Sequence, residues 1–496
     1  MLEPRHVHVV IVGSGFGGLG AAIRLKQRGM DDFIILERAD SVGGVWRDNS
    51  YPGCACDVQS HLFSFSFAPN PRWTHDYSPQ GEIWEYLRDC ASRFGITPHL
   101  RFGHELLEAE WNDARRRWHL KTPKGAFTAD VLVSAMGGLS EPSIPPLPGL
   151  DTFQGKVMHS ARWDHAHSLA GQRVAVVGTG ASAIQFVPRI QPRVARLSLF
   201  QRTPPWILPR GNRAISARVM RLFQRMPLAL WLARAGLFVK HEFLLLAFRH
   251  PSLMRWVRRQ SLRHLARGVP DPVLRARLTP DYQMGCKRVL VSDDYLPSLT
   301  QPNVELITDA IQEIRAHSIL TRAGTEHEVD TIILGTGFHV TDHPSSRRIR
   351  GRDGHTLAEV FAGSPKAHLG MTVSGFPNLF MLLGPNTALG HTSVVLMIEA
   401  QVEHLLNALD FMHGRGVAAV EPRPEAQASF VAAVDAGTRG SVWNQGGCTS
   451  WYLDETGRNS ALWPGFTFTY RHRVERFDPS EYLLLSPPRQ LASTGS

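Results

Sequence analysis

Two glycine-rich turns carry the residues with the clearest chemistry in this chain. They read Gly13-Ser-Gly-Phe-Gly-Gly18 and Gly178-Thr-Gly-Ala-Ser-Ala183, and each follows a short apolar run. In a strand–turn–helix unit the first position permits the tight turn, the second lets the backbone approach a pyrophosphate, and the third allows close helix packing. The pattern therefore predicts two dinucleotide sites, whose cofactor-binding residues are Gly13, Gly15, Gly18, Gly178, Gly180 and Ala183.

The side chain that follows each turn at a fixed distance differs between the two units. Glu37 lies nineteen residues beyond Gly18, and Arg202 lies nineteen residues beyond Ala183. A carboxylate suits ribose hydroxyls and repels a 2′-phosphate, whereas a guanidinium offers bidentate hydrogen bonds to a phosphate. We therefore expect FAD in the first unit and NADPH in the second, with the Thr203 hydroxyl on the same phosphate. An ordinary exposed surface arginine is the alternative for Arg202.

A third pattern lies between the two units, from Phe153 to Asp164. Phe153, Gly155, His159, Trp163 and Asp164 match FxGxxxHxxxW followed by Pro or Asp. This pattern resembles the fingerprint of the Baeyer–Villiger monooxygenases, which belong to the flavin monooxygenase superfamily. Taken alone, the stretch could equally be a loop with a buried tryptophan and a hydrogen-bonded histidine.

Other motifs extend the resemblance from Val7 to about Tyr470. Gly43-Gly-Val-Trp46 and Asp57 resemble the segment beside the flavin, which implies that Gly44, Trp46 and Asp57 border that cofactor. Lys287-Arg288 resembles the pair in which the lysine holds the 2′-phosphate and the arginine is catalytic. An ordinary Lys-Arg pair before a strand is the alternative.

The resemblance also implies roles for six residues around these motifs. Asp57 would orient Arg288, and His159 and Trp163 would couple nicotinamide placement to oxygenation. Thr336 and Gly337 would mark the return of the chain towards the flavin, and Asn386 would precede a helix whose N-terminus faces the flavin ring.

The family's reaction is the oxidation of ketones to esters or lactones with NADPH and O₂. The resemblance implies that reduced FAD forms a C4a-peroxide that attacks the carbonyl, and that sulfides are oxidised too. An N- or S-oxidising flavin monooxygenase is the alternative, although those enzymes carry Tyr or Phe where Trp163 stands. A catalytically inactive, nucleotide-bound interaction or membrane-surface protein is a third alternative. The sequence predicts no metal site, and it identifies neither the ketone nor the oligomeric state.

The order of the elements predicts an α/β fold with two Rossmann-like domains and a helical insertion. We expect an FAD domain in residues 1–141 and 365–496, and an NADPH domain in residues 151–208 and 286–350. The helical insertion would occupy residues 209–285, and the proline-rich run from Ser140 to Pro148 would connect the two domains.

Basic residues are concentrated in the insertion. The chain has a formal net charge of +10, and residues 209–280 contain fifteen Lys or Arg against two acids. We interpret this stretch as a solvated helical insert, with weak contact to an anionic membrane surface as the minority alternative and no role for nucleic acid. Met226 to Phe248 is predicted to be a pair of helices, since Arg234, Lys240, His241 and Glu242 interrupt its apolar character.

The cysteines and the N-terminal residues predict the cellular location. Five cysteines, an odd number, argue against a disulfide framework and for a reducing compartment. Cys54 and Cys56 fit neither a metal spacing nor a CxxC pair, so both are expected to be small packing residues. The N-terminus resembles no signal peptide, and a cytoplasmic protein is expected. The aromatic stretch from Cys448 to Gly465 would border the substrate cavity, or serve only for packing.

Overall fold

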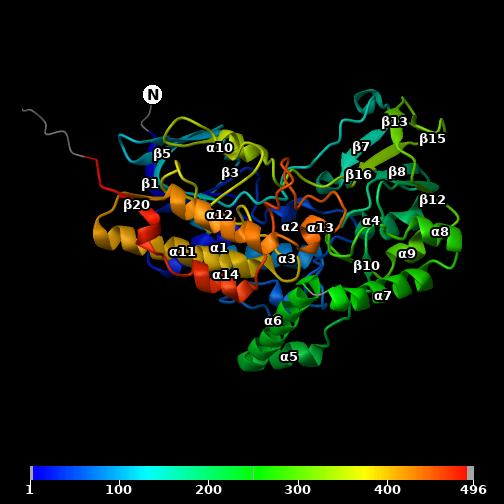
Figure 1. The fold of residues 1–496 in the computed structure, drawn as a ribbon, viewed down its shortest axis with the longest axis horizontal. Helices are drawn as coiled ribbons and strands as arrows, with labels where there is room; N and C mark the ends of the chain where they lie inside the picture. Colours follow the sequence, from blue (N-terminus) through cyan, green and yellow to red (C-terminus); the bar gives the residue numbers. More distant parts are fainter. Residues whose placement is uncertain (1–3, 250, 489–496) are drawn as a thin grey trace, which may run out of the picture.

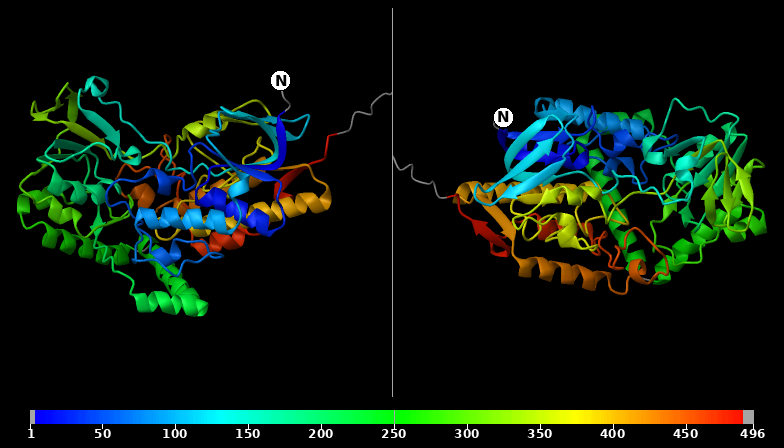
Figure 2. Two further views of the ribbon diagram at one scale, coloured as in Figure 1. Left: turned by 180° about the vertical axis from the view of Figure 1, so that it is seen from behind. Right: turned by 90° about the horizontal axis from the view of Figure 1, so that it is seen from above.

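Two α/β lobes lie side by side, with a layer of helices below them (Figures 1 and 2). The structure is a computed structural model that describes residues 4–249 and 251–488. We refer to the lobe that contains the N-terminus as the first lobe and to the other as the second lobe. The predicted α/β fold with two Rossmann-like units is confirmed.

The first lobe contains an eight-stranded sheet in the order β17-β4-β5-β6-β1-β2-β3, with β18 also paired to β6. The strands around β1 run parallel, and β5 runs antiparallel to its neighbours. Val9, Val10 and Ile11 are almost fully buried, as expected for a strand covered on both faces. The strands are β1 Arg5–Val12, β2 Phe33–Glu37, β3 Leu100–Phe102, β4 Glu108–Asn112, β5 Arg117–Thr122, β6 Gly125–Ser134, β17 Ile349–Arg350 and β18 Leu379–Met381.

Helices α1 (Phe16–Gln27) and α11 (Val394–Arg415) pack against each other and share one hydrophobic core with β1. Five apolar side chains with 3-4-3-4 spacing along α11 are buried: Val395, Ile398, Val402, Leu405 and Leu409. The other helices and strands of this lobe are α2 Val45–Asp48, α3 Gln80–Arg93, α10 Leu357–Phe361, α12 Pro424–Thr438, α13 Val442–Gln445, α14 Thr467–Val474, β19 Ala419–Pro422 and β20 Tyr482–Leu485.

The second lobe contains a five-stranded parallel sheet in the order β12-β9-β8-β16-β7. Helix α4 begins at the end of the second glycine turn, as predicted, and packs against this sheet. A small antiparallel sheet, β13-β14-β15, completes the lobe. The elements are β7 Lys156–His159, β8 Arg173–Val177, α4 Ala183–Ile190, β9 Arg196–Phe200, α9 Tyr295–Ser298, β12 Val304–Ile307, β13 Ile311–Ile314, β14 Ser318–Thr321, β15 Glu326–Glu328 and β16 Thr331–Leu334.

The insertion is helical, as predicted, and is closed at its base by the two short strands β10 and β11. The expectation of two helices between Met226 and Phe248 was wrong, because this stretch forms the single helix α6. Its polar residues do not interrupt it, since Arg234, His241 and Glu242 make contacts with other parts of the protein. Among the described residues, none of the helices has the length and apolar character needed to cross a membrane. The elements are β10 Ile207–Leu208, α5 Ala217–Arg225, α6 Pro227–Arg249, α7 Pro251–Gly268, α8 Pro272–Arg277 and β11 Leu290–Val291.

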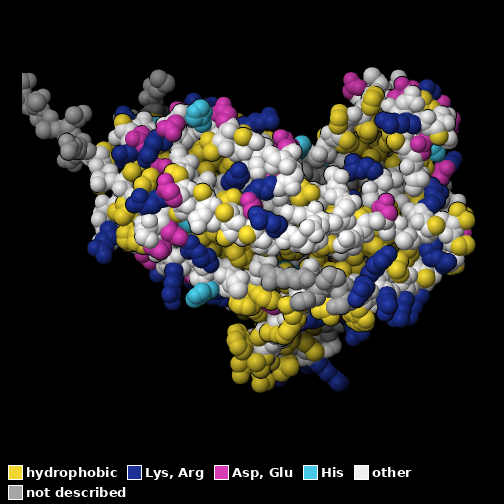
Figure 3. Space-filling model, viewed as in Figure 1, with side chains coloured by type: hydrophobic (Ala, Val, Ile, Leu, Met, Phe, Trp, Pro, Cys, Tyr) yellow, Lys and Arg dark blue, Asp and Glu magenta, His cyan; other side chains and the backbone are white. Residues whose placement is uncertain are grey.

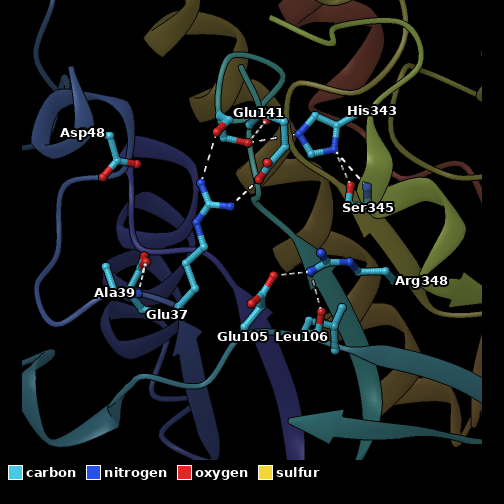
Figure 4. Close-up of polar contacts among 12 residues, drawn as sticks. Glu37, Ala39, Asp48, Glu105, Leu106, Glu141, His343, Ser345 and Arg348 are labelled. Atoms are coloured by element: carbon cyan, nitrogen blue, oxygen red, sulfur yellow. Dashed lines mark hydrogen bonds and ion pairs between the residues drawn. The ribbon is translucent and has the colours of Figure 1, made fainter. Parts of the chain in front are cut away.

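The chain crosses between the lobes at two places that lie side by side. The outgoing crossing after β6 pairs with the returning one after β16: the Thr336 hydroxyl donates to the Ser143 carbonyl (2.5 Å), and the His339 amide donates to the Glu141 carbonyl (2.9 Å). Figure 4 shows the contacts of Glu141, His343 and Arg348 at this junction. The expected NADPH range 286–350 ends in β17, which pairs with β4 in the first sheet.

The cysteines differ in part from the prediction. Cys286 and Cys448 form a disulfide (Cα–Cα 6.2 Å), which runs against the expectation of no disulfide framework drawn from the five cysteines. The two cysteines are 162 positions apart, and only the folded chain brings them together. The count of cysteines in the sequence cannot reveal such a pairing. Cys54 and Cys56 are free and buried, as predicted for packing residues. Burial raises the pKa of the Cys54 thiol to about 12.

His404 on α11 should make the stability of the first lobe sensitive to acid. One ring nitrogen lies 2.7 Å from the Val474 carbonyl and the other 2.9 Å from the Tyr482 hydroxyl, and burial lowers the pKa of this imidazole to about 4. Between about pH 6.5 and 4, His404 is protonated in the unfolded chain but stays neutral in the folded chain. The free energy of unfolding should therefore fall between about pH 6.5 and 4, by up to about 1.4 kcal/mol per pH unit for this one group.

Chemical denaturation from pH 7 to 5 measures this dependence. His404→Asn should be less stable than the native protein at pH 7, and the difference should shrink as the pH falls. His413→Asn, at an exposed position on the same helix, is the control and should follow the native protein. Parallel stability curves for His404→Asn and the native protein would contradict the prediction.

Candidate functional site

Asp57 and Arg288 form a bidentate ion pair between two segments that are 231 residues apart. Arg288 Nε lies 2.7 Å from Asp57 Oδ2, and Nη2 lies 2.9 Å from Oδ1. Burial alone would raise the pKa of Asp57, but the guanidinium of Arg288 holds it below its usual value. The carboxylate raises the pKa of Arg288 in turn, so the site contains a permanent cation with a fixed orientation.

Two further segments complete the surroundings of Arg288. Its Nη1 lies 3.4 Å from the Leu389 carbonyl, just before α11. The Tyr452 side chain, in the C-terminal segment, is buried near Arg288. Burial raises the pKa of this phenol to about 12, and the positive charge of Arg288 opposes that shift. Sequence reasoning missed Tyr452, because only the aromatic richness of Cys448 to Gly465 pointed to this stretch.

The first glycine turn has the geometry of a phosphate cradle. A Cβ at Gly18 would lie 1.9 Å from the Gly13 carbonyl oxygen, so only glycine allows the helix to begin this close to the turn. A Cβ at Gly15 would lie 3.6 Å from the Cα of Gly44, so the backbone of the first glycine turn packs closely against the backbone at Gly44. Exposed main-chain amides at a helix start fit the pyrophosphate of a dinucleotide.

Glu37 ends β2 beside this turn. Its Oε2 accepts hydrogen bonds from the Ser14 amide (3.0 Å) and hydroxyl (2.6 Å), and its Oε1 accepts from the Ala39 amide (3.0 Å; Figure 4). Arg47 Nη1 lies 3.2 Å from Oε1. The carboxylate is therefore held rigidly at the position where the fold predicts a ribose.

The second turn is built the same way but is more open. A Cβ at Gly178 would lie 2.5 Å from the Gly335 carbonyl oxygen, whereas a Cβ at Gly180 would meet no atom within 4 Å. The Ala183 Cβ lies against Gly335, where an added Cβ would be 3.5 Å from it. Thr203 accepts a hydrogen bond at its carbonyl from the Thr179 hydroxyl (3.2 Å). The open position at Gly180 leaves room for a pyrophosphate.

Arg202 and Lys287 form a cationic pair next to this turn. Burial lowers the pKa of Lys287, and so does the positive charge of Arg202 nearby, although Asp281 opposes the effect. The Lys287 ammonium lies 5.1 Å from the centre of the Tyr282 ring. Within the described part of the chain, neither cation has a carboxylate within ion-pair distance. Two neighbouring cations without such a carboxylate fit a bound phosphate group.

His159 and Trp163 lie on the second-lobe side of the crossing. His159 ends β7, its ring packs 5.8 Å from that of Phe338, and burial lowers its pKa to about 4. The Trp163 ring lies 5.5 Å from that of Phe186 on α4. Among the contacts of the described residues, none joins either side chain to Asp57 or Arg288.

The remaining predicted residues have clear structural contacts. The Trp46 ring packs 5.3 Å from that of Phe63, next to the loop that carries Asp57. The Asn386 side chain donates to the Asn459 carbonyl (2.7 Å) and accepts from Arg458 (2.8 Å), so it ties the C-terminal segment to the loop before α11. The Gly337 carbonyl accepts from the Ser143 amide (2.9 Å) in the crossing.

A pocket of about 460 Å³ lies next to the loop that ends in Asp57. Arg210 contributes to its lining and donates to the Cys56 carbonyl (2.9 Å), and Arg189 also borders it. A smaller pocket of about 200 Å³ lies beside Trp163 and Pro52. The larger pocket is lined by residues of the first lobe, α4 and the insertion, and its charged side chains are basic. A basic pocket between the lobes is suited to an anionic cofactor.

Comparisons with known proteins agree with this geometry. A family model described as pyridine nucleotide-disulphide oxidoreductase matches residues 10–220. A Baeyer–Villiger monooxygenase of Streptomyces coelicolor is 51% identical over 494 residues, which cover 99% of this chain and 95% of that protein. Cyclohexanone monooxygenase from Rhodococcus sp. Phi1 bound to NADP⁺ superposes with a TM-score of 0.87 at 28% identity, covering 98% of this chain and 100% of that one. A complex of OTEMO with FAD and NADP also has a TM-score of 0.87, at 26% identity, covering 96% of this chain and 99% of that one.

Arg202→Ala should reduce the discrimination between dinucleotides with and without a 2′-phosphate. A charge-assisted hydrogen bond contributes about 1.5–3 kcal/mol, so the affinity for NADP⁺ should fall at least about tenfold while that for NAD⁺ stays nearly unchanged. Isothermal titration calorimetry measures both affinities. Arg196→Ala is the matched control, since that arginine lies on β9, the strand before Arg202, and pairs with Glu305. An equal loss for both dinucleotides would contradict the assignment.

Proposed function

The chain belongs to the family of Baeyer–Villiger monooxygenases, and we propose that Arg288, oriented by Asp57, is its catalytic residue. The enzyme is a flavoprotein monooxygenase that uses FAD, NADPH and O₂ and converts ketones to esters or lactones. The observation that carries the proposal is the bidentate pair, which presents a permanent cation between the flavin-side loop and the insertion.

When bound, FAD supplies the activation of oxygen after its reduction by NADPH. The chain supplies the electrostatics around this chemistry. A fixed cation favours the deprotonated form of an acidic group nearby, and it stabilises negative charge that develops on oxygen as a carbonyl is attacked. Arg288 can perform both tasks without a change of protonation state, because Asp57 raises its already high pKa.

The two lobes divide the cofactors between them. Residues 1–141 and 365–496 would form the FAD domain, where the cradle of Gly13, Gly15 and Gly18 and the carboxylate of Glu37 fit the dinucleotide. Residues 151–208 and 286–350, up to the return into β17, would form the NADPH domain. Its 2′-phosphate would lie between Arg202, Lys287 and the Thr203 hydroxyl, where the cationic pair fits it.

His159 and Trp163 would link nicotinamide placement to oxygenation through the crossing. Support comes from the position of His159, whose ring packs against Phe338 in the returning crossing. A neutral imidazole at this place is expected to position rather than to transfer protons, because burial lowers its pKa to about 4. Sulfide oxidation and a cytoplasmic location stay predictions, which product analysis and cell fractionation would test.

Arg288→Ala should retain FAD and lose ester formation by at least about 10²-fold, the usual cost of removing one donor that stabilises an oxyanion. The measurement is the yield of ester from a panel of ketones with NADPH under air, detected by mass spectrometry. The absorbance of bound flavin is the check on folding. Ester formation at a nearly native rate in this variant would refute the role of Arg288.

Tyr452→Phe should have a smaller effect, because it removes only the polar hydroxyl that interacts with Arg288 and leaves the ion pair in place. A single hydrogen bond contributes about 0.5–1.5 kcal/mol, so kcat for ester formation should fall roughly 3- to 10-fold. Tyr470→Phe is the control: that buried phenol donates to the Leu369 carbonyl, so its loss should lower stability and not kcat. Unchanged kcat in Tyr452→Phe would mean that the tyrosine does not position Arg288.

A further inference from the structure

Helix α5 and the outer part of α6 project from the molecule and expose an unusual number of apolar side chains. Leu228, Trp231 and Phe243 are 64%, 62% and 65% exposed. Figure 3 shows this projection as a continuous hydrophobic area below the body of the protein. We call it the apolar corner, which consists of Val219, Leu222, Met226, Leu228, Trp231, Leu232, Val239 and Phe243.

The spacing of these residues places most of them on one face of α6. Leu228, Trp231, Leu232, Val239 and Phe243 recur at helical intervals along nearly the whole helix. Monomeric proteins rarely expose contiguous apolar patches of this kind unless the patch meets a partner or a membrane.

The exposed charges in the described parts of α5 and α6 are all positive. Arg218, Arg221 and Arg225 are exposed on α5 at one-turn spacing, next to its apolar residues. Among the described residues, these three arginines have no carboxylate within ion-pair distance. The only two acids of residues 209–280 are engaged elsewhere: Glu242 is buried and accepts from the Thr467 amide, and Asp271 caps its own helix.

The opposite side of the projection is fixed to the protein. Arg234 donates to the His61 carbonyl and the Ser64 hydroxyl (2.7 Å for the latter), and His241 lies 3.2 Å from the Gln59 side chain. The Phe223 ring of α5 lies 5.0 Å from that of His61. The polar face of α6 is therefore occupied, and the helix cannot turn its apolar face inward without breaking these contacts.

We infer that the apolar corner docks into the surface of a membrane that contains anionic lipids. Leucine, phenylalanine and tryptophan side chains would enter the boundary between headgroups and acyl chains, and the arginines of α5 would meet the lipid phosphates. The helices would lie in the plane of the membrane and not cross it. The charge pattern selects the anionic surface, since every exposed ionic side chain in the described parts of α5 and α6 is a cation.

A second copy of the chain is a less suitable partner. A two-fold contact through the apolar corner would bring the arginine row of one copy close to that of the other. No exposed carboxylate of residues 209–280 is available to neutralise that repulsion, because both acids of this stretch are already engaged.

Cosedimentation of the FAD-loaded enzyme with vesicles tests the inference. It should bind vesicles of phosphatidylglycerol and phosphatidylcholine, bind phosphatidylcholine alone more weakly, and lose affinity for the anionic vesicles as salt is raised. The triple variant Leu228→Ser, Trp231→Ser, Leu232→Ser should lose more than about tenfold in vesicle affinity. Arg218→Gln, Arg221→Gln and Arg225→Gln should each cost roughly fivefold on anionic vesicles only.

A matched variant, Val360→Ser with Leu484→Ser, removes exposed apolar side chains elsewhere and should bind vesicles like the native enzyme. Oxidation of a water-soluble ketone should be unchanged in all variants, which confirms that each is folded. Failure of the native enzyme to bind anionic vesicles would overturn the inference, as would native binding by the triple serine variant. A native dimer that the triple variant converts to a monomer, without vesicle binding, would assign the apolar corner to a second copy.

Discussion

The ion pair between Asp57 and Arg288 is the interaction on which the arrangement of the site depends. Withdrawing two charges from water costs free energy, and their attraction seldom does more than offset that cost. The pair is therefore a poor means of stabilising the fold. The pair fixes the orientation of the Arg288 guanidinium instead. The carboxylate accepts from Nε and Nη2, and Nη1 faces the loop before α11. A neutral or unpaired side chain would give neither the permanent charge nor the orientation.

The segments that meet at this pair come from distant parts of the sequence. Asp57 follows the first nucleotide turn, Arg288 leaves the insertion, and Tyr452 belongs to the C-terminal segment. The disulfide Cys286–Cys448 and the hydrogen bond from the Gln283 amide to the Gly446 carbonyl join the last two segments close to the site. The position of Arg288 is thus determined jointly by both lobes and by the insertion.

Features set by local sequence could be predicted, and features set by tertiary contact could not. Strand–turn–helix order and the residue nineteen positions later identified both nucleotide units, because backbone geometry near a pyrophosphate restricts the sequence directly. The disulfide and Tyr452 have no such local pattern. The interpretation of α6 as two helices failed for a related reason: Arg234 and Glu242 look like interruptions in the sequence, but their polar groups are satisfied by the His61 carbonyl and the Thr467 amide.

The same contacts make α6 the link between the surface and the site. Its outer residues, such as Trp231, form the apolar corner, while His241 reaches Gln59, two residues beyond Asp57. Further along, Leu245 is buried in one hydrophobic cluster with Tyr452, whose phenol interacts electrostatically with Arg288. A displacement of α6 would therefore act on both partners of the ion pair at once, through the segment after Asp57 and through Tyr452. The polar face of α6 is bound to the rest of the protein, and its apolar face is exposed to the surroundings. Binding of the apolar face to a membrane surface would therefore act, through α6, on the loops around Arg288.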